Sequence, residues 1–222
     1  MNISFTEENY LKAIYALSHF YEASEVSTNQ ISDRLKNKAA TVTDMLKRLA
    51  EKKLISYKPY QGVKLTEKGR TTAIKVIRKH RLWEVFLVEK LKFSWDEVHE
   101  IAEQLEHIHS DELIEKLDDF LGKPKFDPHG DPIPDAAGKF STQKSIALSL
   151  ANKKASLVIT GVTDHSKAFL QYISNNGLKL GDNLKIEDSN EYDQSLKIKI
   201  NNKHILFLSN KAASNILVEI KK

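Results

Sequence analysis

The sequence of 222 residues contains no cysteine, and this absence removes two kinds of chemistry. Without cysteine the chain forms no disulfide bonds, and any metal ion must be bound by imidazole, carboxylate, amide or water ligands. We therefore do not expect a sensor of soft metals, because such ions are selected by sulfur ligands.

Long apolar runs and a secretion signal are also missing. No run of about 18 apolar residues, enough to cross a bilayer, occurs in the sequence. Residues Met1 to Phe5 lack the basic start and apolar stretch of a signal peptide. Hydrophobic residues make up 41% and charged residues 29% of the chain, which is typical of a folded soluble protein. We expect a cytoplasmic protein with no membrane partner.

Charge is unevenly distributed along the chain. Residues 1–80 carry 15 Lys and Arg against 8 Asp and Glu, residues 81–140 carry 7 against 15, and residues 141–222 carry 12 against 7. A basic segment suits a polyanion and an acidic segment suits cations, although ordinary solvated surfaces show the same bias. This length allows two or three small domains, so motifs must decide what each part does.

The N-terminal segment has the pattern of a winged helix-turn-helix. Apolar residues at helical spacing predict a first helix over residues 5–17. Ser27 to Gln30 form a capping box that starts a short second helix, and a third helix is predicted from about Ala40 to Lys52. Residues 54–57 and 63–65 favour strands, and the segment between them contains proline and glycine, which predicts a hairpin wing.

Polar and basic residues on the third helix favour DNA binding over a helical domain with an incidental hairpin. Thr41 and Thr43 are expected to bind phosphates, and Lys47 and Arg48 add positive charge. The predicted DNA-contacting set also includes residues at the helix starts and on the wing: Ser27, Thr28, Lys38, Ala40, Thr41, Thr43, Asp44, Lys47, Arg48, Lys58, Tyr60 and Lys64.

Histidine and glutamate in the middle of the chain predict a metal site. His80 and Glu84 are four residues apart on a long predicted helix, so they share one face. The next predicted helix, from Asp96 to about His109, places four possible ligands within an arc of roughly 100°, and these are His99, Glu103, Glu106 and His107. An isolated helix of this kind is more often a solvated acidic helix, but the neighbouring pair favours a site for Mn²⁺, Fe²⁺ or Zn²⁺.

Five blocks of the sequence resemble the diphtheria-toxin-repressor family of iron- and manganese-dependent regulators. The blocks are Thr6 to Tyr15, Ala40 to Thr43, Arg78 to Glu84, Glu106 to Asp111, and Asp127 to Pro134. The resemblance implies a mainly α fold with β structure. Its expected parts are a winged helix-turn-helix at 1–72, a helical metal-binding and dimerisation domain at 73–140, a linker with a helical middle at 141–154, and an SH3-like β-barrel at 155–222. Alternating apolar runs after residue 183 are consistent with such a barrel.

The resemblance also implies a ligand set and a mechanism. Asn9, Glu103, Glu106 and His107 correspond to a primary, activating site, and His80, Glu84 and His99 to an ancillary site. The C-terminal domain can add Asp164 to the ancillary site, with capping of the following helix as the alternative. One ion would join the first helix to the dimerisation helices and so fix the spacing of two DNA readers. The implied protein is a homodimeric repressor of metal-uptake genes that binds a palindromic operator in double-stranded DNA.

Glu103 favours Mn²⁺ as the activator, with Fe²⁺ as the alternative, because a hard ion prefers carboxylate to the thiolate of iron-type members. Zn²⁺ or Co²⁺ are expected to enter the sites in vitro. Two residues depart from the family pattern: Asn9 matches neither branch, and Lys12 stands where paired-metal members have a glutamate.

No nucleophile motif, phosphate loop or pair of catalytic carboxylates occurs, so we expect no enzyme activity and no small-molecule substrate. Three alternatives remain open. They are a winged-helix regulator that does not depend on metal, a metalloenzyme that uses the His/Glu cluster, and a metal-storage or transport accessory protein. His129 and His204 join no spacing pattern and are interpreted as structural or surface residues.

Overall fold

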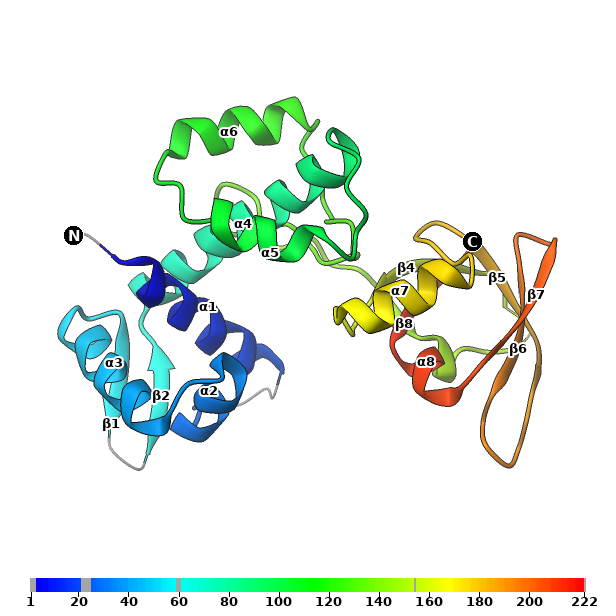
Figure 1. Ribbon diagram of the computed structural model, residues 1–222, viewed down its shortest axis with the longest axis horizontal. Helices are drawn as coiled ribbons and strands as arrows, with labels where there is room; N and C mark the ends of the chain where they lie inside the picture. The colour runs from blue at the N-terminus through cyan, green and yellow to red at the C-terminus, as the bar shows by residue number, and fades with distance from the viewer. Residues whose placement is uncertain (1–2, 21–24, 59–60, 154, 222) are drawn as a thin grey trace. The chain divides into compact units, whose positions relative to one another are not determined.

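The computed structural model describes residues 3–20, 25–58, 61–153 and 155–221, and the chain divides into two compact units. The first unit comprises Met1–His80, Glu103–Lys116 and Pro134–Phe140, and the second comprises Arg81–Ala102, Leu117–Ile133 and Ser141–Lys222. Figure 1 labels the helices and strands of both units. Among the described helices, none combines the length and the apolar character needed to cross a membrane.

The first unit begins with the predicted winged helix-turn-helix (Figure 1). Its elements are α1 (Phe5–Phe20), α2 (Thr28–Leu35), α3 (Ala39–Glu51) and the strands β1 (Ile55–Lys58) and β2 (Gly62–Leu65). The strands pair antiparallel, with Ile55 opposite Leu65. The helix-turn-helix and the wing expected from the sequence are therefore confirmed.

A local cap and a shared core hold α3 in place. The Ser27 hydroxyl accepts the backbone N–H of Gln30, and the Gln30 side chain accepts that of Ser27, so the predicted capping box is present. Side chains from α1, α2, α3 and the wing then form one buried cluster that includes Leu11, Ile14, Ile31, Val42, Leu46, Leu49 and Val63. Because the apolar side of α3 faces this core, its polar side is left exposed.

The middle of the chain contains α4 (Glu67–Glu89), α5 (Val98–Leu105) and α6 (Asp111–Phe120). The helix predicted from Asp96 to His109 is wrong in its extent, because α5 ends at Leu105. The Leu105 carbonyl accepts the N–H of Ile108 in a turn, and the Ser110 hydroxyl accepts the N–H of Leu113 at the start of α6. Glu106 and His107 therefore lie in a turn, and the four predicted ligands do not share one helical stripe.

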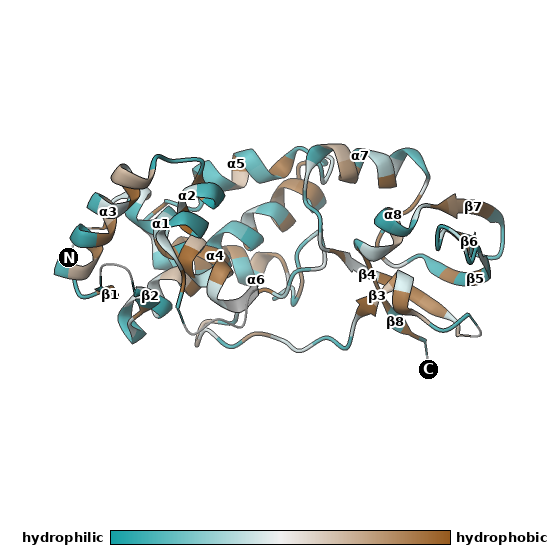
Figure 2. Cartoon of the chain, turned by 90° about the horizontal axis from the view of Figure 1, so that it is seen from below, coloured by the Kyte–Doolittle hydropathy of each residue, from teal (hydrophilic) through white to brown (hydrophobic). Residues whose placement is uncertain are grey.

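The C-terminal part of the second unit is a six-stranded antiparallel sheet in the order β3-β8-β4-β5-β6-β7, which confirms the expected SH3-like β domain. Its elements are β3 (Ile146–Ala147), a 3-10 turn (Leu148–Leu150), β4 (Leu157–Val162), α7 (Lys167–Asn175), β5 (Asn183–Ser189), β6 (Leu196–Ile200), β7 (His204–Leu208), α8 (Asn210–Ser214) and β8 (Ile216–Ile220). Hydrophobic residues along these strands appear in brown in Figure 2.

The segment expected to be a linker with a helical middle takes part in this sheet. Ile146 pairs with Val218 of β8, and Leu148 is fully buried in the C-terminal core. Residues 146–150 therefore belong to the C-terminal fold, because pairing with β8 and burial of Leu148 outweigh the local helical pattern.

Candidate metal centre and DNA-binding surface

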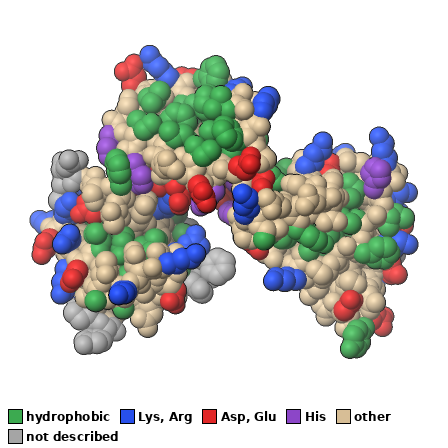
Figure 3. Space-filling view, viewed as in Figure 1, with side chains coloured by type: hydrophobic (Ala, Val, Ile, Leu, Met, Phe, Trp, Pro, Cys, Tyr) green, Lys and Arg blue, Asp and Glu red, His purple; other side chains and the backbone are tan. Residues whose placement is uncertain are grey.

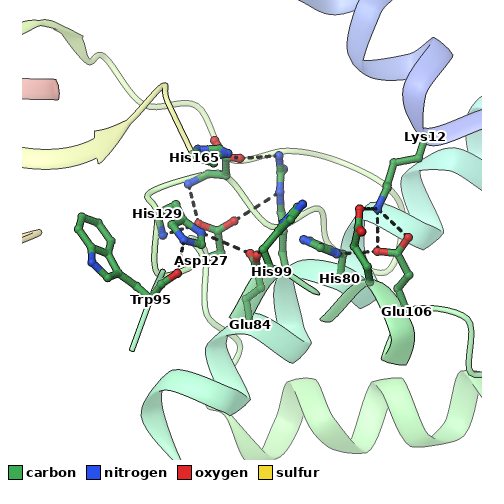
Figure 4. Close-up of polar contacts among 12 residues, drawn as sticks. Lys12, His80, Glu84, Trp95, His99, Glu106, Asp127, His129 and His165 are labelled. Carbon is green, nitrogen blue, oxygen red and sulfur yellow. Dashed lines mark hydrogen bonds and ion pairs between the residues drawn. The ribbon is translucent and has the colours of Figure 1, made fainter. Parts of the chain in front are cut away.

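Glu106 is the centre of a buried ionic cluster in the first unit. Its side chain is completely buried, and Lys12 of α1 donates hydrogen bonds of 2.6 and 2.8 Å to its two oxygens. His80 of α4 forms a third hydrogen bond, with 2.6 Å between Nδ1 and Oε2 (Figure 4). Both predicted ligands, His80 and Glu106, are thus brought together, and the turn that carries Glu106 is joined to the first helix.

These partners keep Glu106 ionised although it is buried. Burial by itself raises the pKa of this carboxyl group, but the hydrogen bonds and charges of His80 and Lys12 outweigh burial and lower the pKa below the ordinary 4.5. The cluster therefore keeps Glu106 as a carboxylate, which is the form that binds a cation.

A second contact joins α1 to the same turn. Glu8 is 4% exposed, and its Oε2 lies 2.6 Å from Nδ1 of His107. The Phe5 ring stacks on the His107 ring with 4.6 Å between centroids, and Lys79 Nζ lies 3.8 Å from Glu8. Glu8 was not among the ligands predicted from the sequence. The available signal was its position one helical turn before Lys12, on the same side of α1.

The other two members of the predicted primary set are arranged differently. The side-chain amide oxygen of Asn9 is buried and has no hydrogen-bond partner among the described residues. Glu103 is about half exposed (48%), with one oxygen 3.6 Å from Lys12 Nζ. In the described part of the chain, the groups of three or more ligands within 4.8 Å of one another do not include Glu103, Glu106 or His107. These donors suit a divalent ion in kind, but both Glu106 oxygens are bound to the Lys12 ammonium.

The second unit contains a further group of possible ligands, of which only Glu84 was predicted from the sequence. Glu84, Asp127 and His129 are all buried, and each offers a ligand atom within 4.8 Å of the others (Figure 4). The Trp95 carbonyl accepts a hydrogen bond from Nε2 of His129 at 2.8 Å, so Nδ1 faces Glu84 at 3.5 Å. A hydrogen bond of this kind on the outer ring nitrogen orients a metal-binding imidazole. His129 is therefore a candidate ligand, although its place outside any spacing pattern had indicated a structural or surface residue.

Close backbone packing places this loop. A Cβ atom on Gly130, whose φ is +90°, would lie 2.2 Å from the Thr160 carbonyl oxygen of β4. The Val162 N–H donates to the His129 carbonyl at 2.9 Å, and Asp127 Oδ1 accepts the N–H groups of His129 and Asp131. Gly130 and these backbone hydrogen bonds thus fix the loop against β4. The sequence alone shows this loop only as a proline-rich segment.

Burial and neighbouring charges shift the protonation of this group. Burial, with the charges of Asp131 and Glu84, raises the pKa of Asp127 to about 7. Burial disfavours charge on His129, but the hydrogen bond and charge of Glu84 outweigh it and raise the His129 pKa to about 9. A bound cation would replace the imidazolium proton, because only the neutral ring can be a ligand.

Of the remaining predicted ligands, His99 and His80 lie close to Glu84, whereas Asp164 does not. His99 Nδ1 lies 3.5 Å from Glu84, and His80 precedes Glu84 by one turn of α4. The Asp164 carboxylate accepts the N–H of Ser166, the N-cap residue of α7, and does not join the Glu84 group. The helix cap itself is therefore Ser166, and Asp164 stabilises the turn that precedes it.

The predicted DNA-binding residues form an exposed face on α3. Lys38, Ala40, Thr41, Asp44, Lys47 and Arg48 are exposed. Thr43 donates its hydroxyl to the Ala39 carbonyl, and the Ser27 hydroxyl serves the cap of α2, where Thr28 is half-buried. On the wing, Lys58 is exposed and Lys64 Nζ lies 3.1 Å from Glu25, while Tyr60 lies outside the described residues.

Three known protein families match consecutive parts of the chain. Residues 2–63 match "Iron dependent repressor, N-terminal DNA binding domain", residues 66–135 match "Iron dependent repressor, metal binding and dimerisation domain", and residues 146–220 match "FeoA domain".

The chain is also similar to individual proteins that are described as repressors. The iron-dependent repressor IdeR of Mycobacterium tuberculosis is 37% identical over 129 residues, which cover 58% of this chain and 55% of IdeR. The diphtheria toxin repressor of Corynebacterium glutamicum is 34% identical over 129 residues, 58% of this chain and 56% of its own length. The match thus spans about half the length of these curated relatives. A solved manganese-dependent transcriptional repressor in complex with manganese is 33% identical, covers 97% of this chain and 100% of its own, and has a TM-score of 0.84.

Proposed function

Because this chain belongs to the iron-dependent repressor family, we propose that it is a transcriptional repressor whose binding to DNA is controlled by a divalent metal ion. The observation that carries the proposal is the pair of buried contacts between α1 and the Glu106–His107 turn. Lys12 binds Glu106 and Glu8 binds His107, so a helix of the DNA-binding domain is tied directly to predicted metal ligands. A change in ligand geometry can therefore move the DNA-reading helices. We expect this regulator to act in the cytoplasm on operators of metal-uptake genes.

We infer that Mn²⁺ is the activating ion. Asn9, Glu103, Glu106 and His107 would hold the primary ion, and Glu84, Asp127 and His129 a second one, with His80 and His99 beside Glu84. Nitrogen and oxygen donors without sulfur suit Mn²⁺, and two similar structures are described as a manganese-dependent repressor and a manganese regulator. A bound ion would supply positive charge on which buried carboxylates and imidazoles converge.

Anaerobic titration tests the metal dependence and the identity of the metal together. A fluorescent promoter fragment from upstream of the chain's own gene is mixed with chelator-treated protein, and Mn²⁺ or Fe²⁺ is added stepwise. Half-maximal DNA binding is expected at a lower concentration of Mn²⁺ than of Fe²⁺. A lower midpoint for Fe²⁺ would reassign the metal, and no response to either ion would refute the proposed function.

We propose that the repressor is a homodimer formed through an apolar surface on its helical region. Figure 3 shows hydrophobic side chains gathered over this region. In the second unit, Phe120 at the end of α6 is 63% exposed, and Leu91 and Phe93, just after α4, are also exposed. Large apolar side chains in such a patch are typical of an interface. The matched family description names this region as a dimerisation domain.

Replacing Phe120 by aspartate is expected to weaken the dimer at least about tenfold, because a charge would be buried at the interface. Sedimentation velocity at several protein concentrations measures this change. Tyr192→Asp is the matched control, since Tyr192 is a 97% exposed aromatic residue on the turn between β5 and β6. Dimerisation of Phe120→Asp at wild-type concentrations would place the interface elsewhere.

A further inference from the structure

We propose that the Lys12 ammonium competes with the metal ion for the carboxylates of the primary site, Glu103 and Glu106. This competition sets the metal concentration at which the site, called the cluster below, becomes occupied. The inference rests on the proposed metal dependence. Lys12 extends from α1 toward Glu106, and its Nζ lies 2.6 and 2.8 Å from the two Glu106 oxygens and 3.6 Å from Glu103 (Figure 4). One ammonium thus contacts two of the predicted carboxylate ligands.

Electrostatics makes this arrangement a competition. A divalent ion that binds Glu106 must take an oxygen that Lys12 now holds, and two cations this close repel strongly where water is scarce. Glu106 is completely buried, so solvent screens this repulsion little. The Lys12 side chain is 20% exposed and has a flexible four-carbon stem, which allows the ammonium to withdraw into water when an ion enters.

Lys12 also has a structural effect that opposes its effect on metal binding. Its bond to Glu106 joins residues 94 positions apart and ties α1 to the ligand turn without any ion. Removal of its charge therefore leaves buried Glu106 with one partner fewer. The protein without metal becomes less stable, while the cluster gains affinity for a cation that can restore the missing charge.

Replacement of Lys12 by methionine, which is similar in length but uncharged, tests the competition in the full-length chain. Chelator-treated protein is titrated with Mn²⁺ in competition with a fluorescent chelator, and thermal unfolding is followed with and without Mn²⁺. We expect Mn²⁺ to bind this cluster at least about tenfold more tightly. We also expect a lower unfolding midpoint without metal and a larger increase when Mn²⁺ is added. Lys12→Gln, which is neutral but can still donate to Glu106, gives the same comparison if Lys12→Met does not fold.

Two further variants locate the effect. Lys52→Met removes another lysine that binds a buried glutamate of α1, since Lys52 Nζ lies 2.7 Å from Glu7. It should alter stability while leaving Mn²⁺ affinity at the wild-type value. Glu103→Gln in the Lys12→Met background should cancel the gain, because Glu103 belongs to the cluster. Unchanged or weaker Mn²⁺ affinity in folded Lys12 variants, beside a wild type that responds to Mn²⁺, would overturn this inference alone. Absence of Mn²⁺ binding in wild type and variants alike would overturn the proposed function as well.

Discussion

Glu106→Ala is expected to abolish metal-stimulated DNA binding and to lower the free energy of unfolding by about 3 kcal/mol. Both effects have one cause. Glu106 is completely buried and binds Lys12 and His80, so its removal takes away a predicted metal ligand and leaves the Lys12 ammonium and the His80 ring without their carboxylate partner. Urea unfolding of the metal-free protein measures the stability loss, and fluorescence anisotropy with a labelled promoter fragment measures the response to Mn²⁺.

A more exposed ligand separates the loss of metal binding from the loss of stability. Glu103 is 48% exposed, so Glu103→Gln should change the unfolding free energy by less than about 0.5 kcal/mol. It should nevertheless raise the Mn²⁺ concentration needed for DNA binding. Glu112→Ala, at an 80% exposed position on α6, is the matched control and should behave as wild type. A wild-type metal response in Glu106→Ala would remove Glu106 from the site.

The double replacement Lys47→Ala and Arg48→Ala is expected to lower DNA affinity by roughly 10- to 100-fold at moderate salt. Both side chains are exposed on α3, and each DNA phosphate that they no longer neutralise should reduce the slope of log affinity against log salt by about one. Stability should change little, since the Lys47–Asp44 ion pair is exposed on both sides. Anisotropy titrations at several salt concentrations measure affinity and slope together.

The control for this pair is Lys203→Ala, which removes an exposed lysine from the turn between β6 and β7 of the C-terminal sheet. It lowers the net charge without touching α3 and should leave the salt slope unchanged. If the double variant kept the wild-type affinity and salt slope, α3 would not be the DNA-reading helix.

The DNA-binding fold could be predicted because its signals are local. The capping box at Ser27 and the apolar spacing on α3 each involve residues within a few positions of one another. Helical periodicity wrongly predicted that α5 continues beyond Leu105. Ser110 caps a new helix, α6, and the chain turns between the two helices. The single helical stripe predicted for His99, Glu103, Glu106 and His107 is therefore absent.

The site residues that the sequence did not predict are placed by contacts between distant parts of the chain. Glu8 reaches His107, and Asp127 and His129 reach Glu84, through packing that no periodic pattern encodes. Lys12 is the clearest example. The sequence showed that Lys12 departs from the family pattern, but it did not show that Lys12 contacts Glu106. Only the fold shows that the ammonium lies between two predicted ligands.

The most direct test of metal control is the DNA affinity of wild-type protein at one salt concentration, measured in excess chelator and again in saturating Mn²⁺. Allosteric coupling between sites is typically about 1–3 kcal/mol, so the affinity for the promoter fragment should rise by roughly 5- to 150-fold with Mn²⁺. Equal affinities under the two conditions would contradict metal control of DNA binding.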